Sequence, residues 1–176
     1  SLCTSIADKT ENRVIFYGVN TPIYAARVDE LSDAPYCIRC KHEYVYDYVT
    51  YGHLGGYRCP ACGYARPQPQ VAVTEVVRSD SECSQVVFSV DAQSIPATIC
   101  LPGGYNIYNA CACMAAASVM GIDMELAAKS LSSFACGFGR MEKFRINDAD
   151  VRMILIKNPA GCNQVLNFLT QRTEPF

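Results

Sequence analysis

The chain has 176 residues, half of them hydrophobic, and its 15 basic and 17 acidic residues give a formal net charge of −2. This length allows one domain with a sizeable core or two small ones, and the absence of any basic block argues against a nucleic-acid-binding protein. No apolar run approaches the roughly 18 to 20 residues that span a bilayer, and no signal peptide is apparent, so we expect a cytoplasmic chain without a transmembrane segment.

The first predicted element is a buried strand over residues 13–19, a short run of apolar, β-branched and aromatic side chains. Nothing before it could complete a sheet, so we expect this sequence to be part of a longer protein.

Two Cys-x-x-Cys pairs follow, separated by 18 residues, and this spacing is typical of a structural zinc site. Each pair fits a tight turn, and together they supply the four thiolates of a closed tetrahedral site: Cys37, Cys40, Cys59 and Cys62. Gly63 stands where such a turn tolerates a positive φ. Residues 44–48 and 51–57 are expected to form a short hairpin. We therefore predict a zinc ribbon over residues 35–66; two disulfides or four unligated cysteines are the alternative.

The other cysteines are odd in number and scattered along the chain, which favours reduced thiols over a disulfide framework. They are Cys3, Cys83, Cys100, Cys111, Cys113, Cys136 and Cys162.

After the ribbon the pattern predicts three antiparallel strands, over residues 71–78, 86–90 and 97–101. A helix of small residues follows, capped by Asn106 and ended by Gly121. Asp123 is expected to cap a second helix that runs to about Ser133. The rest of the chain predicts a glycine-containing loop at 136–142, a hairpin of 143–146 with 151–156, and a helix from Cys162 to about Gln171.

Three stretches, residues 101–110, 139–144 and 155–164, together resemble the Mur ligases, the ATP-dependent enzymes that assemble the peptidoglycan stem peptide. Their sequences are Leu-Pro-Gly-Gly-Tyr-Asn-Ile-Tyr-Asn-Ala, Gly-Arg-Met-Glu-Lys-Phe and Leu-Ile-Lys-Asn-Pro-Ala-Gly-Cys-Asn-Gln. The ribbon, the run from Tyr51 to Cys59, and Lys157 before Asn-Pro narrow the resemblance to the branch that amidates lipid II.

The resemblance implies an α/β fold in three parts. Residues 1–34 and 67–136 would be part of the Mur ligase central domain, 35–66 the inserted four-cysteine zinc ribbon, and 137–176 the start of a Rossmann-like carboxy-terminal domain.

The implied chemistry is activation of the α-carboxylate of D-glutamate in lipid II by ATP and Mg²⁺, followed by attack of ammonia to give D-isoglutamine. The ammonia would come from a glutaminase partner, GatD, and lipid II would be met at the membrane surface. In agreement with that division, both histidines, His42 and His53, lie within the ribbon, so no glutaminase dyad is evident.

Carried over to this sequence, the family's nucleotide contacts would be Asn109, with Asn106, on the adenine side, and Arg140 from the carboxy-terminal domain. An amide can both donate to and accept from a purine edge, and a guanidinium offers several donors. From the residues alone, Asn106 is a helix cap and Arg140 a solvated loop charge. Glu142 and Lys157 are weaker candidates.

The chain also departs from the family pattern. It has no Gly-x-x-Gly-Lys-Thr phosphate loop and no magnesium-binding acids of the central domain, and the catalytic aspartate is expected beyond Phe176. We therefore assign no catalytic residue and expect this stretch alone to be inactive.

Two other functions are considered. Seven tyrosines interleaved with basic residues between Tyr36 and Arg66 could stack on bases and contact phosphates, as in a zinc-ribbon nucleic-acid binder. An ordinary Mur ligase that adds an amino acid is the other possibility, against which the ribbon and Lys157 argue.

Overall fold

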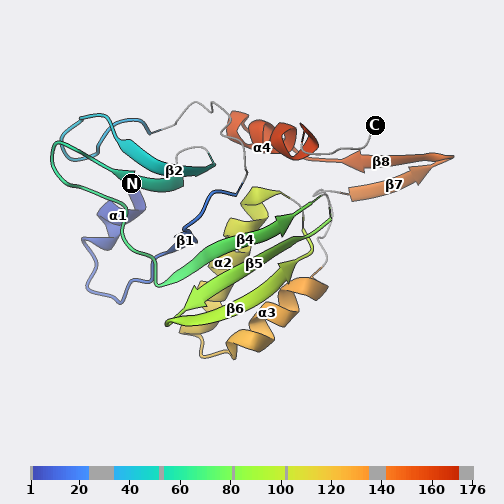
Figure 1. The fold of residues 1–176 in the computed structure, drawn as a ribbon, viewed down its shortest axis with the longest axis horizontal. Helices are drawn as coiled ribbons and strands as arrows, with labels where there is room; N and C mark the ends of the chain where they lie inside the picture. Colours follow the sequence, from blue (N-terminus) through green and yellow to red (C-terminus); the bar gives the residue numbers. More distant parts are fainter. Residues whose placement is uncertain are drawn as a thin grey trace.

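The structure, a computed structural model, describes residues 2–23, 34–51, 54–80, 82–101, 103–134 and 142–170. Figure 1 shows three neighbouring parts: a four-stranded sheet with two helices, a two-stranded sheet that belongs to the ribbon, and a second two-stranded sheet followed by a helix. A short helix, α1 (Leu2–Ala7), which the sequence analysis did not predict, precedes them.

The main sheet has the order β1-β4-β5-β6. β1 runs parallel to β4, and β4, β5 and β6 are antiparallel neighbours, which confirms that prediction. The strands are β1 (Tyr17–Val19), β4 (Val71–Ser79), β5 (Ser84–Val90) and β6 (Gln93–Ile99).

Several predicted strand boundaries were wrong, most of all those of β1 and β6. β1 is shorter than the predicted 13–19. Phe16 N donates to the Gln70 side chain, and Phe16 O accepts from Gln70 N, so Phe16 lies just outside the paired residues of β1 and β4. β6 starts at Gln93 because a two-residue turn, Asp91 and Ala92 with φ of 47° and 66°, closes the β5–β6 hairpin at once. β6 is an edge strand, so it tolerates Pro96 inside it.

Two helices complete this part of the molecule, which we call the sheet domain (β1, β4, β5, β6, α2 and α3). α2 (Gly104–Val119) packs against β1 and β4, and α3 (Met124–Ser133) packs along β6. The fully buried side chains of the sheet domain include Val19, Val73, Phe88, Ile107 and Met114. The Asp123 side chain accepts from Leu126 N at 2.8 Å, and Gly121 has φ of 70°, so both predicted helix signals are confirmed.

The predicted cap of α2 was wrong. The cap residue is Gly103, with φ of 96° and no side-chain bond, and Asn106 lies inside the first turn with its side chain buried. A glycine at a positive φ allows the chain to enter the helix at once, so α2 begins before Asn106.

The last part contains the hairpin of β7 (Glu142–Ile146) and β8 (Ala149–Met153), and α4 (Pro159–Thr170). The turn is shorter than predicted, Asn147 and Asp148, with φ of 54° at Asn147, and β8 ends at Met153. α4 starts before Cys162 because proline is favoured in a first turn and Asn158 accepts from Gly161 N at 2.7 Å. The Rossmann-like arrangement of this part stays a prediction. Of the predicted loop 136–142, residues 136–141, with Cys136 and Arg140, lie outside the described residues.

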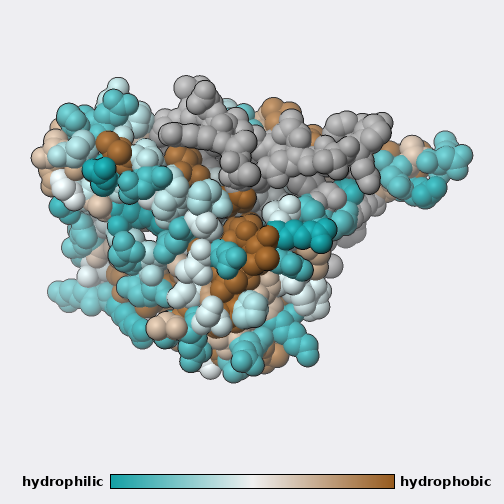
Figure 2. Space-filling view, viewed as in Figure 1, coloured by the Kyte–Doolittle hydropathy of each residue, from teal (hydrophilic) through white to brown (hydrophobic). Residues whose placement is uncertain are grey.

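Figure 2 shows a hydrophobic patch near the centre of the face in view, with hydrophilic residues beside it. A groove of about 540 Å³ lies between β5, β6 and α3, lined by residues that include Val77, Val87, Pro96 and Lys129. None of the candidate site residues lines this groove. In the described part of the chain, no helix is long and apolar enough to cross a membrane.

Candidate metal centre

The two Cys-x-x-Cys pairs form two turns of the same construction. Cys37 accepts at its carbonyl from Lys41 N at 2.9 Å, and Cys59 accepts from Gly63 N at 3.0 Å. The residue four positions after each first cysteine has a positive φ, 64° at Lys41 and 73° at Gly63. Gly63 was predicted from its type; Lys41 was missed because lysine rarely adopts this conformation.

These turns bring the four sulfur atoms of Cys37, Cys40, Cys59 and Cys62 within 4.8 Å of one another. The Cys37 and Cys62 sulfurs are 3.6 Å apart, and those of Cys40 and Cys59 are 3.4 Å apart. Zinc–sulfur bonds of about 2.3 Å in a tetrahedron put the sulfurs about 3.8 Å apart, so the set fits one zinc ion. The ion itself is an inference from this donor set.

The pKa values of the cluster thiols are shifted in opposite directions. At Cys37, burial opposes the charge, but the backbone N–H groups of Cys40 and Arg39 outweigh it and lower the pKa to about 6. At Cys62, the N–H of Tyr64 lowers the pKa, but burial and the neighbouring sulfurs prevail and raise it to about 12. Four thiolates this close repel each other, and a divalent cation relieves that repulsion.

The ribbon hairpin, β2 (Val45–Tyr51) and β3 (Leu54–Arg58), carries tyrosines that pack beneath the cluster. The Tyr44 and Tyr57 rings lie 4.9 Å apart, and the Arg39 guanidinium lies 4.5 Å from the centre of the Tyr64 ring. Tyr44 and Tyr64 are buried. These two rings form the ribbon core and are not presented for stacking on nucleobases.

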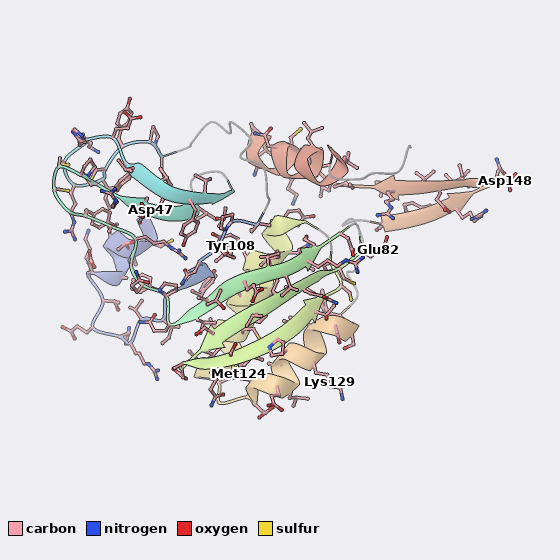
Figure 3. All side chains as sticks on the ribbon, viewed as in Figure 1. Asp47, Glu82, Tyr108, Met124, Lys129 and Asp148 are labelled. Atoms are coloured by element: carbon pink, nitrogen blue, oxygen red, sulfur yellow. The ribbon has the colours of Figure 1, made fainter. Side chains whose placement is uncertain are left out.

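Polar contacts join the ribbon to the sheet domain. Arg66 donates to Tyr48 Oη at 2.6 Å and to Asn20 Oδ1 at 2.9 Å. The hydroxyl groups of Thr50 and Tyr108 lie 2.6 Å apart, and Figure 3 shows Tyr108 between α2 and the ribbon. These contacts could not be predicted from local sequence patterns, because each joins residues far apart in the chain.

The structure brings together two of the three predicted nucleotide contacts. Asn109 Nδ2 donates to Asn106 Oδ1 at 3.2 Å across one turn of α2, with Asn109 exposed and Asn106 buried. Arg140 lies outside the described residues, so its place beside them stays a prediction. Glu142 begins β7, and Lys157 is exposed between β8 and α4.

Of the two ribbon histidines, only His42 lies in the described part of the chain. His42 is exposed, and its carbonyl accepts from Cys37 N at 2.7 Å; His53 lies outside the described residues.

No family model matches the chain. It is 35% identical over 140 residues to the MurT subunit of lipid II isoglutaminyl synthase (glutamine-hydrolyzing) from Streptococcus pneumoniae, a match that covers 80% of this chain and 30% of that protein. The Staphylococcus aureus MurT subunit is 24% identical over 154 residues, covering 88% of this chain and 34% of the relative. The chain thus spans about a third of the length of these relatives.

Among solved structures, a pseudomurein peptide ligase type C from Methanothermus fervidus superposes with a TM-score of 0.75 and 26% identity over 93% of this chain and 32% of that one. MurF from Acinetobacter baumannii has a TM-score of 0.54 and 20% identity over 60% of this chain and 23% of its own, and supports the fold alone. Both likenesses agree with the Mur ligase-type fold that the sequence resemblance implied.

Proposed function

We propose that this chain, which is similar to MurT subunits and to a Mur ligase-like solved structure, is part of the ligase subunit of a lipid II isoglutaminyl synthase. The reaction would amidate the α-carboxylate of D-glutamate in lipid II. The observation that carries this proposal is the 35% identity to a MurT subunit over 80% of the chain.

In the proposed reaction, ATP with Mg²⁺ converts the carboxylate to an acyl phosphate, and ammonia then displaces phosphate to leave the amide. A glutaminase subunit, GatD, would supply the ammonia, at the cytoplasmic face of the membrane that holds lipid II. We assign this chain no residue that touches the reacting carboxylate; its share of the work is to hold the nucleotide and to build the scaffold.

Within this scheme, Asn106, Asn109 and Arg140 would contact ATP. Asn109 is suited to the role because its side chain is exposed while its amide is oriented by the buried Asn106. The four-cysteine cluster would hold a structural zinc, since all four positions are filled by protein and none is left for water.

The test uses the complete protein that contains this chain, together with a glutaminase partner, lipid II, glutamine and ATP. Amidation replaces a hydroxyl by an amino group, so the product should be about 1 Da lighter by mass spectrometry. Ammonium salt supplied directly should replace the partner and glutamine. Consumption of ATP without amide formation under both conditions would overturn the proposal.

A second candidate is a ligase that adds an amino acid to a peptide precursor, favoured by the likeness to a pseudomurein peptide ligase over 93% of the chain. The same assay separates the two functions when free amino acids are added in place of ammonia. A product heavier by one amino-acid residue would support this candidate, and a product amidated by ammonia would exclude it.

A further inference from the structure

Two cysteines outside the ribbon lie opposite each other at one end of the β5–β6 pair. Ser84 of β5 pairs with Ile99 of β6, so Cys83 and Cys100 flank this terminal pair just outside the two strands. Their sulfur atoms are 2.7 Å apart, closer than the 3.4 Å between Cys40 and Cys59 in the metal cluster. In the sequence they look like scattered thiols, because they are 17 positions apart.

We propose that Cys83 and Cys100 are a modification site at which a reversible disulfide bond forms, separate from the metal cluster. Directly opposed residues on antiparallel strands have Cα atoms about 4.5 to 5.5 Å apart, within the range that a disulfide spans without moving the backbone. Both cysteines are partly exposed, so a small reagent can reach them.

A metal site does not explain this pair. Among the described residues, the one group of three or more potential metal ligands is the ribbon set. Two thiolates without further ligands do not close a tetrahedral site. The pair is therefore suited to forming a disulfide and lacks the further ligands that a metal centre needs.

The two cysteines of the pair have different roles in the hydrogen bond between them. Cys83 donates its thiol hydrogen to Cys100 Sγ. That bond, with burial and the nearby carboxylates of Asp80 and Glu82, raises the pKa of Cys83 to about 11. Cys100, which accepts the bond, is the sulfur placed to react first.

The step balances with a low-molecular-weight disulfide as the oxidant. The Cys100 thiolate attacks the reagent, forms a mixed disulfide and releases one small thiolate. Cys83 then loses its proton, attacks the Cys100 sulfur and releases the second small thiolate. The protein loses two electrons and two protons, and the reagent is reduced to two thiols.

The position of the pair determines which two segments a Cys83–Cys100 disulfide would connect. Glu82, beside Cys83, forms an ion pair at 2.7 Å with Arg152 of β8, and Figure 3 shows Glu82 at the sheet end that faces this hairpin. Cys100 lies three residues before Gly103, the cap of α2. A disulfide would tie the β4–β5 turn to the segment that enters the helix of Asn106 and Asn109.

The test treats reduced, zinc-saturated protein with oxidised glutathione and then alkylates the remaining thiols. Residues 79–129 contain no tryptic site before Lys129, so chymotryptic cleavage after Phe88 is needed to separate the two cysteines. We expect a peptide pair joined through Cys83 and Cys100, which dithiothreitol releases, and a melting temperature about 10 °C higher in the oxidised protein, from closure of this loop.

The variants Cys83→Ser and Cys100→Ser should each abolish the joined peptides and the rise in melting temperature. Cys113→Ser, at an exposed thiol of α2, should keep both. Independent alkylation or separate glutathionylation of Cys83 and Cys100 in the folded wild-type protein would overturn the proposal.

Discussion

In the ribbon, burial opposes ionisation of Cys37, but neighbouring N–H groups hold the pKa of its thiol at about 6. In the sheet domain, burial raises the pKa of Cys111 to about 11, and its sulfur faces the carbonyls of Gly18 and Val71. The same residue type is thus a prospective thiolate ligand in one region and a neutral packing group in the other.

The cores of the two regions differ in the same sense. Buried side chains of the ribbon form a small cluster around two cysteines and two tyrosines, Cys37, Cys59, Tyr44 and Tyr64. The sheet domain buries a continuous set of valine, isoleucine, phenylalanine and methionine side chains from both sheet and helices. We infer that the ribbon depends on its metal for folding, whereas the sheet domain depends on apolar burial.

The largest effect should come from Cys59→Ser. Structural zinc contributes on the order of 10 kcal/mol of apparent binding energy, most of what is available to fold so small a module. Elemental analysis should find about one zinc per chain in the wild type and a loss in the variant. Amide exchange should show lost protection over 35–66, while β4, β5 and α2 keep theirs.

Cys113→Ser is the control, because this exposed thiol lies on α2, away from the cluster. Equal loss of protection in the ribbon and in α2 of Cys59→Ser would contradict the separation of the two regions. A folded, metal-free ribbon in the wild type would contradict the zinc assignment.

A core substitution should produce the opposite pattern at a smaller cost. Met114→Ala leaves a cavity among fully buried residues, which costs about 2 to 5 kcal/mol. Urea unfolding followed by circular dichroism should show this loss, with zinc content unchanged. Met120→Ala, at a side chain 74% exposed at the end of the same helix, should cost little. Similar midpoints for both variants would show that the helix face is not packed as described.

The neutral thiol of Cys111 predicts a loss of stability at high pH. Its pKa is about 11 in the folded protein against an ordinary value of 9.0, so its contribution is complete below pH 9 and is lost as the pH rises toward 11. The loss amounts to about 3 kcal/mol at most. Cys111→Ala should remove this part of the alkaline loss, measured as unfolding free energy from pH 7 to 11.

Cys113→Ala should keep the pH dependence of the wild type, because its thiol is exposed. Parallel curves for Cys111→Ala and the wild type would show that Cys111 ionises in the folded state without cost.

The features that could be predicted from the sequence are those that depend on neighbouring residues. The spacing of the cysteine pairs, the positive φ at Gly63 and the Asp123 cap each depend on a few consecutive residues, and the structure agrees with all three. The Asn106 cap failed because two glycines upstream admitted an earlier start.

Contacts between distant residues could not be predicted in this way. Arg66 and Asn20 are 46 positions apart, and Thr50 and Tyr108 are 58 apart. Nothing in local spacing marks these side chains as partners, because only the packing of the ribbon against the end of β1 and against α2 brings them together. The Cys83 and Cys100 pair depended likewise on the register of two strands.

The smallest expected effect tests the boundary between the two regions. Tyr108→Phe removes the hydroxyl that lies 2.6 Å from Thr50 and should cost about 1 kcal/mol, a typical net value for one hydrogen bond. The cost stays small because Thr50 also donates to Leu54 O at 2.9 Å, so its hydroxyl keeps a partner. Amide exchange should rise in β2 and β3 while zinc remains bound. Tyr17→Phe, at a half-exposed ring on β1, is the control and should change little. If Tyr108→Phe instead removed protection from the ribbon and α2 together, as severely as Cys59→Ser does in the ribbon alone, the polar contacts would hold the ribbon more strongly than its metal does, and the two regions would fold as one.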